Sequence, residues 1–428
     1  MLDIRFIREN PEAVRENIRK KFQDERLPLV DEVLALDIEL RETQTEGDKL
    51  RSQRNTKSKE IGGLMKQGLK DEAEKVKEEV KNIGDRLIEL EADLVSKQER
   101  FKEIMFTIPN IMDESVPVGK DDSENVVIEV HGEIVDKGFE VPYHADIMTN
   151  LGGLDLESAR KTSGSGFYYL LGDVARVHTA VISFAREFMI SKGFEYCIPP
   201  YMIRQDVVSG VMSFEEMDNM MYKIEGEDLY LIGTSEHSTI GRYMDTIMDK
   251  ETLPQTLTSF SPCFRKEVGA HGIEERGVYR VHQFEKQEMV VLCDPKDSKE
   301  WFDKLYKYSV ELFLELDIPV RVIECCSGDL ADLKVKSVDV EAYSPRQKKY
   351  FEVCSASNLG EAQARRLKIR VNGEDGNYYP HTLNNTVVAP PRMLIAFFEN
   401  NVNEDGSVNI PEALRPFMGG QEIILPKK

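Results

Sequence analysis

Apolar runs long enough to cross a membrane are missing from this sequence. No stretch of about 18 uninterrupted apolar residues occurs, which is what a membrane-spanning helix requires. The first residues, MLDIRFIRENPEAVREN, also lack the apolar core and the small-residue cleavage site of a signal peptide. We therefore expect no membrane partner and a cytoplasmic location.

Cysteine is scarce as well. The chain has six cysteines in 428 residues, and none stands in a CxxC or Cys/His spacing. This distribution fits neither a disulfide framework nor a zinc knuckle. We expect no structural zinc and reduced, mostly buried thiols at Cys197, Cys263, Cys293, Cys325, Cys326 and Cys354.

Glycine-rich phosphate-binding loops are absent too. The sequence contains neither a GxxxxGK[ST] loop nor a GxGxxG fingerprint. Both motifs hold phosphates at the N-terminus of a helix. A nucleotide bound by this chain must therefore be held by other means.

Positive charge is in deficit, with a net charge of −21, which argues against a nucleic-acid partner because phosphate binding relies on Lys and Arg. The deficit is uneven. Residues 1–110 carry 22 Lys and Arg against 25 Asp and Glu, and the remainder carries a net −18. If RNA is bound, the N-terminal segment is the less repulsive surface.

Proline is missing between Pro28 and Pro109, and aromatic residues are rare there. Glu, Lys, Asp, Arg, Leu and Gln dominate this stretch, a composition typical of helices. Glycines at 62, 63 and 68 mark a break between two heptad patterns, which indicates an antiparallel helical hairpin; a dimerising coiled coil fits the pattern equally well. The first pattern contains Val33, Leu36, Leu40, Leu50, Ile61 and Leu64, and the second contains Val80, Ile83, Leu87, Leu90, Leu94, Phe101 and Ile104, with Lys97 as its polar member.

The rest of the chain mixes helical periods with short β-rich runs. Pro109 ends the helical stretch, and the stretch from there through Val118-Gly119 and Asp121-Asp122 is typical of a linker. A helix is expected over 174–192 and strands over 196–198, 229–232, 289–292 and 320–323. We predict two domains, 1–110 and 120–428, the second an α+β domain built on a largely antiparallel sheet.

Three clusters place polar and charged residues among apolar ones, where burial is costly without a ligand or a partner. The first, Gly233–His237, follows a strand-like run. On a strand, Thr234 and Glu236 share a face and offer a hydroxyl and a carboxylate to an ammonium group. A polar cap at the strand end explains the same residues.

The second cluster runs from Cys263 to Glu288 and contains FRKE at 264–267, a loop with HGIEERG, and RVHQFEKQE from Arg280. It resembles motif 2 of the class II aminoacyl-tRNA synthetases, a strand–loop–strand. There an arginine neutralises the α-phosphate, a carboxylate reads the adenine amino group, and an aromatic ring stacks on the base. A structural ion-pair hairpin matches only part of it.

The third cluster, His381–Thr386 followed by Arg392 and a helix to Asn400, resembles motif 3 of the same class. The planar, permanently charged fork of Arg392 suits a terminal phosphate. The helix over 174–192 and the segment ending at Pro199-Pro200 resemble motif 1, which implies a homodimer.

Within class II, the resemblance narrows to the seryl-tRNA synthetases. The strings TSE at 234–236, FEVCSASN at 351–358, QARR at 363–366 and LNNT at 383–386 occur in that family's order. The resemblance covers essentially the whole chain and favours the hairpin, as the family's tRNA-binding arm. It implies an ATP-dependent serine–tRNA ligase acting on tRNA(Ser) and leaves open a selenocysteine tRNA.

The resemblance also implies roles for individual residues. Arg265, Glu267 and Arg392 would be catalytic, and Glu352 and Ser355 would hold Mg²⁺ with ATP. Serine would be surrounded by Thr234, Ser235, Glu236, Glu288 and Thr386. ATP would be bound by Arg265, Lys266, Glu267, Val281, Phe284, Glu352, Val353, Cys354, Ser355 and Arg392.

Some positions depart from the family's commoner strings. NNTVVAPPR stands where bacterial members carry a glycine-rich NGSG run, and both this string and TSEH are closer to archaeal and eukaryotic forms. His271 is either a contact for the tRNA acceptor end or a solvated loop residue. An inactive paralogue would be expected to lose Arg265, Glu288 or Arg392, and an amino acid:carrier-protein ligase would lack the hairpin.

Overall fold

The computed structural model describes residues 1–267 and 277–427, so His271 lies outside the described residues. The chain divides into two compact units, one spanning Leu2–Pro109 and the other Asn110–Lys428 together with Met1. No helix within the described ranges combines the length and the apolar character that a bilayer crossing demands.

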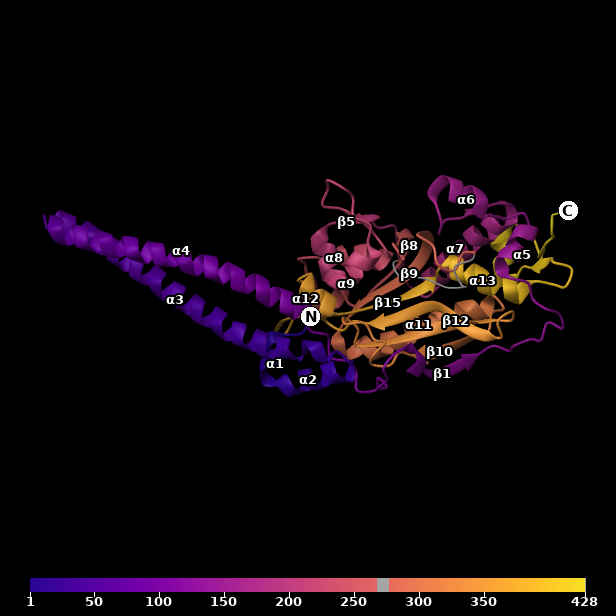
Figure 1. The fold of residues 1–428 in the computed structure, drawn as a ribbon, viewed down its shortest axis with the longest axis horizontal. Helices are drawn as coiled ribbons and strands as arrows, with labels where there is room; N and C mark the ends of the chain where they lie inside the picture. The colour runs from indigo at the N-terminus through magenta and orange to yellow at the C-terminus, as the bar shows by residue number, and fades with distance from the viewer. Residues whose placement is uncertain (268–276, 428) are drawn as a thin grey trace. The chain divides into compact units, whose positions relative to one another are not determined.

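The N-terminal unit is helical. Two long helices, α3 and α4, run alongside each other in Figure 1. Its helices are α1 (Ile4–Glu9), α2 (Pro11–Lys20), the 3-10 helix η1 (Asp24–Arg26), α3 (Leu27–Lys66) and α4 (Lys70–Thr107).

The turn between α3 and α4 contains Gly68, two residues after α3 ends at Lys66. Gly68 has a φ of +78°, the left-handed conformation that glycine adopts without strain. The Leu69 N–H donates to the Leu64 carbonyl at 3.0 Å, and the Gly68 N–H donates to the Met65 carbonyl at 3.3 Å, which together form a Schellman motif. Gly62 and Gly63, expected as part of the break, are helical instead.

The predicted apolar series of α4 faces α3. Leu87, Leu90 and Ile104 are buried in the seam, as is Val33 of α3. Lys97, the polar member of the series, reaches Glu39 of α3 at 3.0 Å. Because both helices belong to one chain and run antiparallel, the prediction of a helical hairpin is confirmed.

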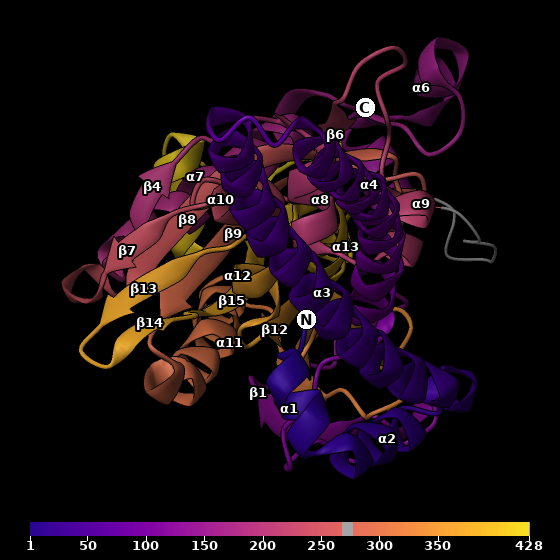
Figure 2. The same cartoon turned by 90° about the vertical axis from the view of Figure 1, so that its left-hand side faces the viewer.

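The second unit is built on an eight-stranded sheet, which confirms the predicted α+β class. The strand order is β1-β10-β11-β12-β15-β9-β8-β4, and every neighbouring pair is antiparallel except β4 with β8. Figure 2 shows β8, β9 and β15 side by side. The strands of this unit are β1 (Val126–His131), β2 (Leu154–Asp155), β3 (Tyr169–Leu170), β4 (Glu195–Cys197), β5 (Met202–Ile203), β6 (Tyr230–Leu231), β7 (Ile247–Asp249), β8 (Gln255–Phe264), β9 (Gln283–Cys293), β10 (Val320–Glu324), β11 (Lys336–Ser344), β12 (Lys349–Asn358), β13 (Arg370–Gly373), β14 (Gly376–Tyr378), β15 (His381–Val388), β16 (Val408–Asn409) and β17 (Ile423–Ile424).

Helices cover the core of this sheet. The largest apolar cluster joins residues of α7, α11 and α13 to inward residues of the central strands, including Met289, Val291, Val340 and Leu383. The helices are α5 (His144–Asn150), α6 (Leu156–Ser163), α7 (Gly172–Ser191), α8 (Gln205–Val211), α9 (Phe214–Met220), α10 (Ser235–Gly241), α11 (Ser298–Glu315), α12 (Ala362–Arg366) and α13 (Pro390–Asn401), with 3-10 helices η2 (Asp122–Glu124), η3 (Lys250–Thr252), η5 (Pro295–Asp297) and η6 (Glu412–Met418).

The stretch expected as a linker packs into the second unit. The buried Asn110 side chain donates to the carbonyls of Leu333 and Leu359 at 3.1 and 3.0 Å. The Ser327 N–H donates to the Pro117 carbonyl at 2.8 Å. The stretch after Pro109 is therefore hydrogen-bonded to the second unit, where it satisfies backbone carbonyl and N–H groups.

Candidate active site

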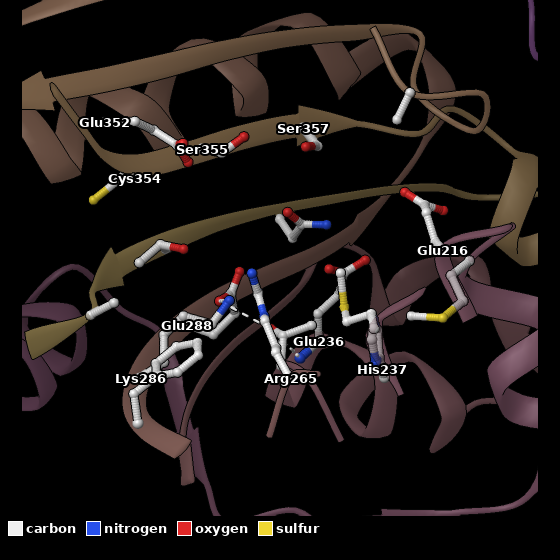
Figure 3. Close-up of a pocket in the computed structure, with 18 of the residues that line it drawn as sticks. Glu216, Glu236, His237, Arg265, Lys286, Glu288, Glu352, Cys354, Ser355 and Ser357 are labelled. Atoms are coloured by element: carbon white, nitrogen blue, oxygen red, sulfur yellow. Dashed lines mark hydrogen bonds and ion pairs between the residues drawn. The ribbon is translucent and has the colours of Figure 1, made fainter. Parts of the chain in front are cut away.

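A cavity of about 340 Å³ opens over the central strands of the sheet, and the predicted residues converge on it. Figure 3 shows side chains from separate elements pointing into this space. The predicted residues that line it are Thr234, Glu236, Arg265, Glu267, Val281, Phe284, Glu288, Glu352, Val353, Cys354, Ser355, Thr386 and Arg392.

Strand alternation builds the floor of the cavity. Phe284, Lys286 and Glu288 are spaced by two along β9 and therefore share one face of the sheet. On β15 the same holds for Asn384 and Thr386, and Thr386 lies directly across from Glu288 in the register. Neighbouring strands thus bring these polar groups into one layer.

A β-bulge on β12 adjusts this alternation. Val340 and Glu341 of β11 pair with Cys354 and Glu352, which leaves Val353 as the extra residue. Because of this extra residue, Glu352 lies on the same face as Ser355. The Cys354 Sγ donates to the Val387 carbonyl at 3.7 Å.

Two arginines, Arg265 and Arg392, line the cavity. Arg265 follows the last residue of β8, and its Nε donates to the Gly233 carbonyl at 3.1 Å while its guanidinium stands 5.3 Å from the centre of the Phe284 ring. Arg392 lies in the first turn of α13 and donates to a Glu352 carboxylate oxygen at 2.8 Å. Burial disfavours the charged form of Glu352, but the charge and hydrogen bond of Arg392, together with the charges of Lys334 and Arg265, lower the pKa of that carboxyl.

Two carboxylates and a lysine form the other end of the cavity. Lys286 Nζ lies 2.5 Å from a Glu288 carboxylate oxygen, and these side chains are only 7% and 2% exposed. The Thr234 hydroxyl donates to Glu288 at 3.3 Å. Glu236 completes the group, and both burial and the nearby Glu288 raise its pKa to about 7.

The local structure around Thr234 differs from the expected strand. Residues Ser235–Gly241 form α10, and Thr234 is its N-cap, with its hydroxyl accepting from the Glu236 N–H at 3.4 Å. The polar cap considered as an alternative is therefore present, although it caps a helix. Thr234 and Glu236 still both face the cavity, because the first turn of α10 points there.

Two predicted residues are not among the described residues that line the cavity. Ser235 is fully buried behind it and accepts a hydrogen bond from the Ser259 hydroxyl at 2.7 Å. Lys266 directs its ammonium group to the Asp218 carbonyl at 3.2 Å. Their assignment to serine and ATP binding stays a prediction.

Sequence reasoning missed several lining residues. Lys286 and Asn384 alternate with predicted residues on β9 and β15, so strand periodicity was the signal that could have found them. His237 also lines the cavity, and burial together with the charges of Lys286 and Arg265 lowers its pKa to about 3. It is therefore neutral near pH 7.

Oxygen donors for a divalent cation are available at Glu352 and Ser355. Within residues 1–267 and 277–427, no three His, Cys, Asp or Glu side chains form a metal-binding group. One carboxylate and one hydroxyl suit Mg²⁺, which prefers oxygen ligands and usually takes the remainder from water and substrate phosphates. The donor set therefore fits a magnesium ion that is shared with a nucleotide.

Comparison with known proteins agrees with this arrangement. The seryl-tRNA synthetase N-terminal domain matches residues 1–112, and the class II tRNA synthetase core domain (G, H, P, S and T) matches residues 220–401. The serine–tRNA ligase of Methanocella arvoryzae is 40% identical over 99% of this chain and 100% of its own length.

Two solved structures are similar over the whole chain. Seryl-tRNA synthetase from Pyrococcus horikoshii, crystallised with ATP, has a TM-score of 0.92 and 40% identity, with 100% of each chain covered. The cytoplasmic serine–tRNA ligase of Naegleria fowleri, in complex with AMP, has a TM-score of 0.88 and 34% identity, covering 100% of this chain and 99% of its own. Full-length similarity at this level, together with the cavity, leads to one conclusion: the chain belongs to the seryl-tRNA synthetase family.

Proposed function

We propose that this chain activates L-serine with ATP to form seryl-adenylate and pyrophosphate, and then transfers the seryl group to tRNA(Ser). The observation that carries the proposal is the convergence of Arg265, Glu288, Glu352 and Arg392 on one cavity. Two arginines suited to phosphates and a carboxylate pair suited to an ammonium group match the two halves of an aminoacyl-adenylate. The ATP and AMP complexes of the two similar structures support the nucleotide.

ATP would lie between the two arginines. Arg265 would bind the α-phosphate and Arg392 the terminal phosphate, because guanidinium groups bind phosphate oxygens in a bidentate way. Phe284 would stack on adenine, while Glu267 would accept from its amino group and the Val281 backbone would contact the base. Lys266, whose ammonium group bonds to the Asp218 carbonyl, stays a predicted ATP contact.

Serine would occupy the carboxylate end. Glu236 and Glu288, with the Thr234 hydroxyl, are suited to its ammonium group, and Thr386 lies beside them. Buried groups that bond the serine hydroxyl would be left unpaired by alanine, which disfavours that substrate.

Glu352 and Ser355 would hold Mg²⁺ together with the ATP phosphates. The ion would supply charge neutralisation for the phosphates when bound. The protein supplies no nucleophile, since the serine carboxylate itself attacks the α-phosphate in line. Arg265 and Arg392 stabilise the negative charge and hold the phosphates aligned, and pyrophosphate leaves.

The helical hairpin α3–α4 would bind tRNA(Ser). Its unit carries the smaller share of the negative charge, so it repels phosphates least. The enzyme would act in the cytoplasm as a homodimer formed through the segment around α7 and β4, which resembles motif 1.

ATP–pyrophosphate exchange with a panel of amino acids tests the activity. Serine is expected to support exchange, and alanine and threonine are expected to be weaker by at least about a hundredfold. Exchange driven by threonine or alanine in preference to serine would overturn the substrate, and no exchange with any amino acid would indicate an inactive paralogue.

Deleting the hairpin from about residue 30 to 105 tests its role. Arg26 Nη1 donates to the Thr107 carbonyl at 3.1 Å, so a short glycine linker can join the cut ends. The truncated enzyme is expected to keep exchange but lose charging of tRNA(Ser), measured as serine attached to tRNA. Undiminished charging would refute this role.

A further inference from the structure

Behind the cavity wall, two buried side chains form a hydrogen-bonded chain that ends on Glu236. Gln363 Nε2 donates to Glu236 Oε1 at 2.7 Å, and Thr382 Oγ1 donates to Gln363 Oε1 at 2.7 Å. Gln363 and Thr382 are both 0% exposed, and neither is among the described residues that line the cavity. Two neutral side chains, Gln363 of α12 and Thr382 of β15, therefore hold the carboxylate of Glu236, which lines the cavity.

The neighbours of Gln363 determine which way its amide points. Its Nε2 also donates to the Val211 carbonyl at 3.3 Å. Both partners of Nε2, a carboxylate and a carbonyl, can only accept, whereas the Thr382 hydroxyl can donate to Oε1. A rotated amide would place its oxygen against two acceptors, so the N–H remains directed at Glu236.

The two carboxylates at this end of the cavity have different partners. Glu288 is neutralised by Lys286 at 2.5 Å. Glu236 makes no ion pair with any residue that the structure describes, and its direct partner is the neutral amide of Gln363. Its charge is therefore free to be offset by a ligand cation.

We propose that Gln363, oriented by Thr382, is a positioning residue that keeps Glu236 aimed and ionised for the α-ammonium group of serine. The inference rests on the proposed function, because the role of Gln363 requires that Glu236 bind the ammonium group of serine in this cavity. A donor to a carboxylate stabilises its charged form, and a fixed donor also restricts its rotation.

The titration of Glu236 supports this role. Burial and Glu288, which faces it from β9, raise the pKa of Glu236 to about 7, while the Gln363 hydrogen bond and the charges of Lys286 and Lys334 act to lower it. Lys286 faces Glu236 from β9, Lys334 from the loop before β11, and Gln363 from α12. Removing the Gln363 donor therefore raises the pKa further, so that less carboxylate is ionised at pH 7.

Gln363→Leu in the full-length enzyme tests the proposal by ATP–pyrophosphate exchange with serine between about pH 6 and 9. In the wild type, kcat/KM for serine is expected to fall as pH drops through about 7. In the variant this midpoint moves up by about one pH unit, which gives an about fivefold loss of kcat/KM at pH 7 that shrinks towards pH 9. KM for ATP stays unchanged, because Gln363 supports only the serine end.

Thr382 provides the matched variants. Thr382→Val removes the hydroxyl at nearly the same shape and is expected to shift the serine midpoint upwards, whereas Thr382→Ser keeps the donor and the wild-type profile. Melting temperatures identify folded variants, and this pair decides the question if Gln363→Leu does not fold.

Folded variants with a wild-type serine profile, or with equal losses for serine and ATP and no pH shift, would overturn the inference. Failure of the wild type to exchange with serine would instead overturn the proposed function.

Discussion

Ion pairs occur in both units of the chain, but their exposure to water differs. In the hairpin, Arg100 of α4 meets Glu32 of α3 at 2.7 Å, and these side chains are 41% and 40% exposed. In the cavity, Lys286 and Glu288 form a pair that is 7% and 2% exposed. Water hydrates the exposed hairpin charges and weakens their attraction. The buried charges of the cavity have lost this hydration, and their attraction for each other compensates for the loss.

This difference indicates how each unit carries its proposed function. Several exposed pairs join α3 and α4, including Arg51 with Glu91 and Arg86 with Glu46, so no single pair is essential to the hairpin. In the cavity, individual buried groups hold particular partners, as Lys286 does Glu288. Point substitutions are therefore expected to have small effects in the hairpin and large effects in the cavity.

The largest effect is expected for Arg265→Ala. This change removes the guanidinium that stands over Phe284, and with it one cation for the charge that develops on the α-phosphate. Loss of one such group costs about 10² to 10³-fold in rate, measured by ATP–pyrophosphate exchange with serine. Arg51→Ala in the hairpin is the matched control and should leave exchange unchanged. Near-equal exchange rates for the two variants would break the comparison.

Lys286→Met is expected to have the next largest effect, on stability. It leaves Glu288 buried without its cation, a change that lowers the free energy of unfolding by about 3–5 kcal/mol. Urea unfolding measures this loss. The double variant Lys286→Met/Glu288→Gln should recover much of the stability while exchange remains impaired. A double variant as unstable as the single one would show that the pair is not the cause.

Arg100→Met is expected to have the smallest effect. The arginine is exposed and water replaces its contacts with Glu32, so the thermal unfolding curve should almost coincide with that of the wild type. Circular dichroism at the helical signal measures it. A loss of stability comparable to that of Lys286→Met would mean that burial does not separate the two kinds of pair.

The hairpin could be predicted from the sequence in its elements but not in its pairing. Heptad spacing predicts an apolar seam, but it does not distinguish a partner helix in the same chain from one in a second chain. The position of the turn was predicted only in part. Gly62 and Gly63 remain helical because seam packing outweighs the cost of about 1 kcal/mol that each glycine imposes on a helix.

The cavity could be predicted where a motif names its residues. Arg265, Glu288 and Arg392 were found in this way, and all three line the cavity. The link from Gln363 to Glu236 joins residues 127 positions apart, which no local pattern reports. The bulge at Val353 turns Glu352 towards the cavity. Because this bulge depends on the register between β12 and β11, the sequence of β12 alone does not predict it.

A crystal structure with a non-hydrolysable seryl-adenylate analogue tests most directly whether one cavity holds both halves of the intermediate. We predict a single bound molecule with adenine against Phe284, its phosphate mimic at Arg265 and its ammonium group between Glu236 and Glu288. An analogue bound elsewhere on the chain, or bound in this cavity without contacting Arg265 or either of these carboxylates, would contradict this prediction.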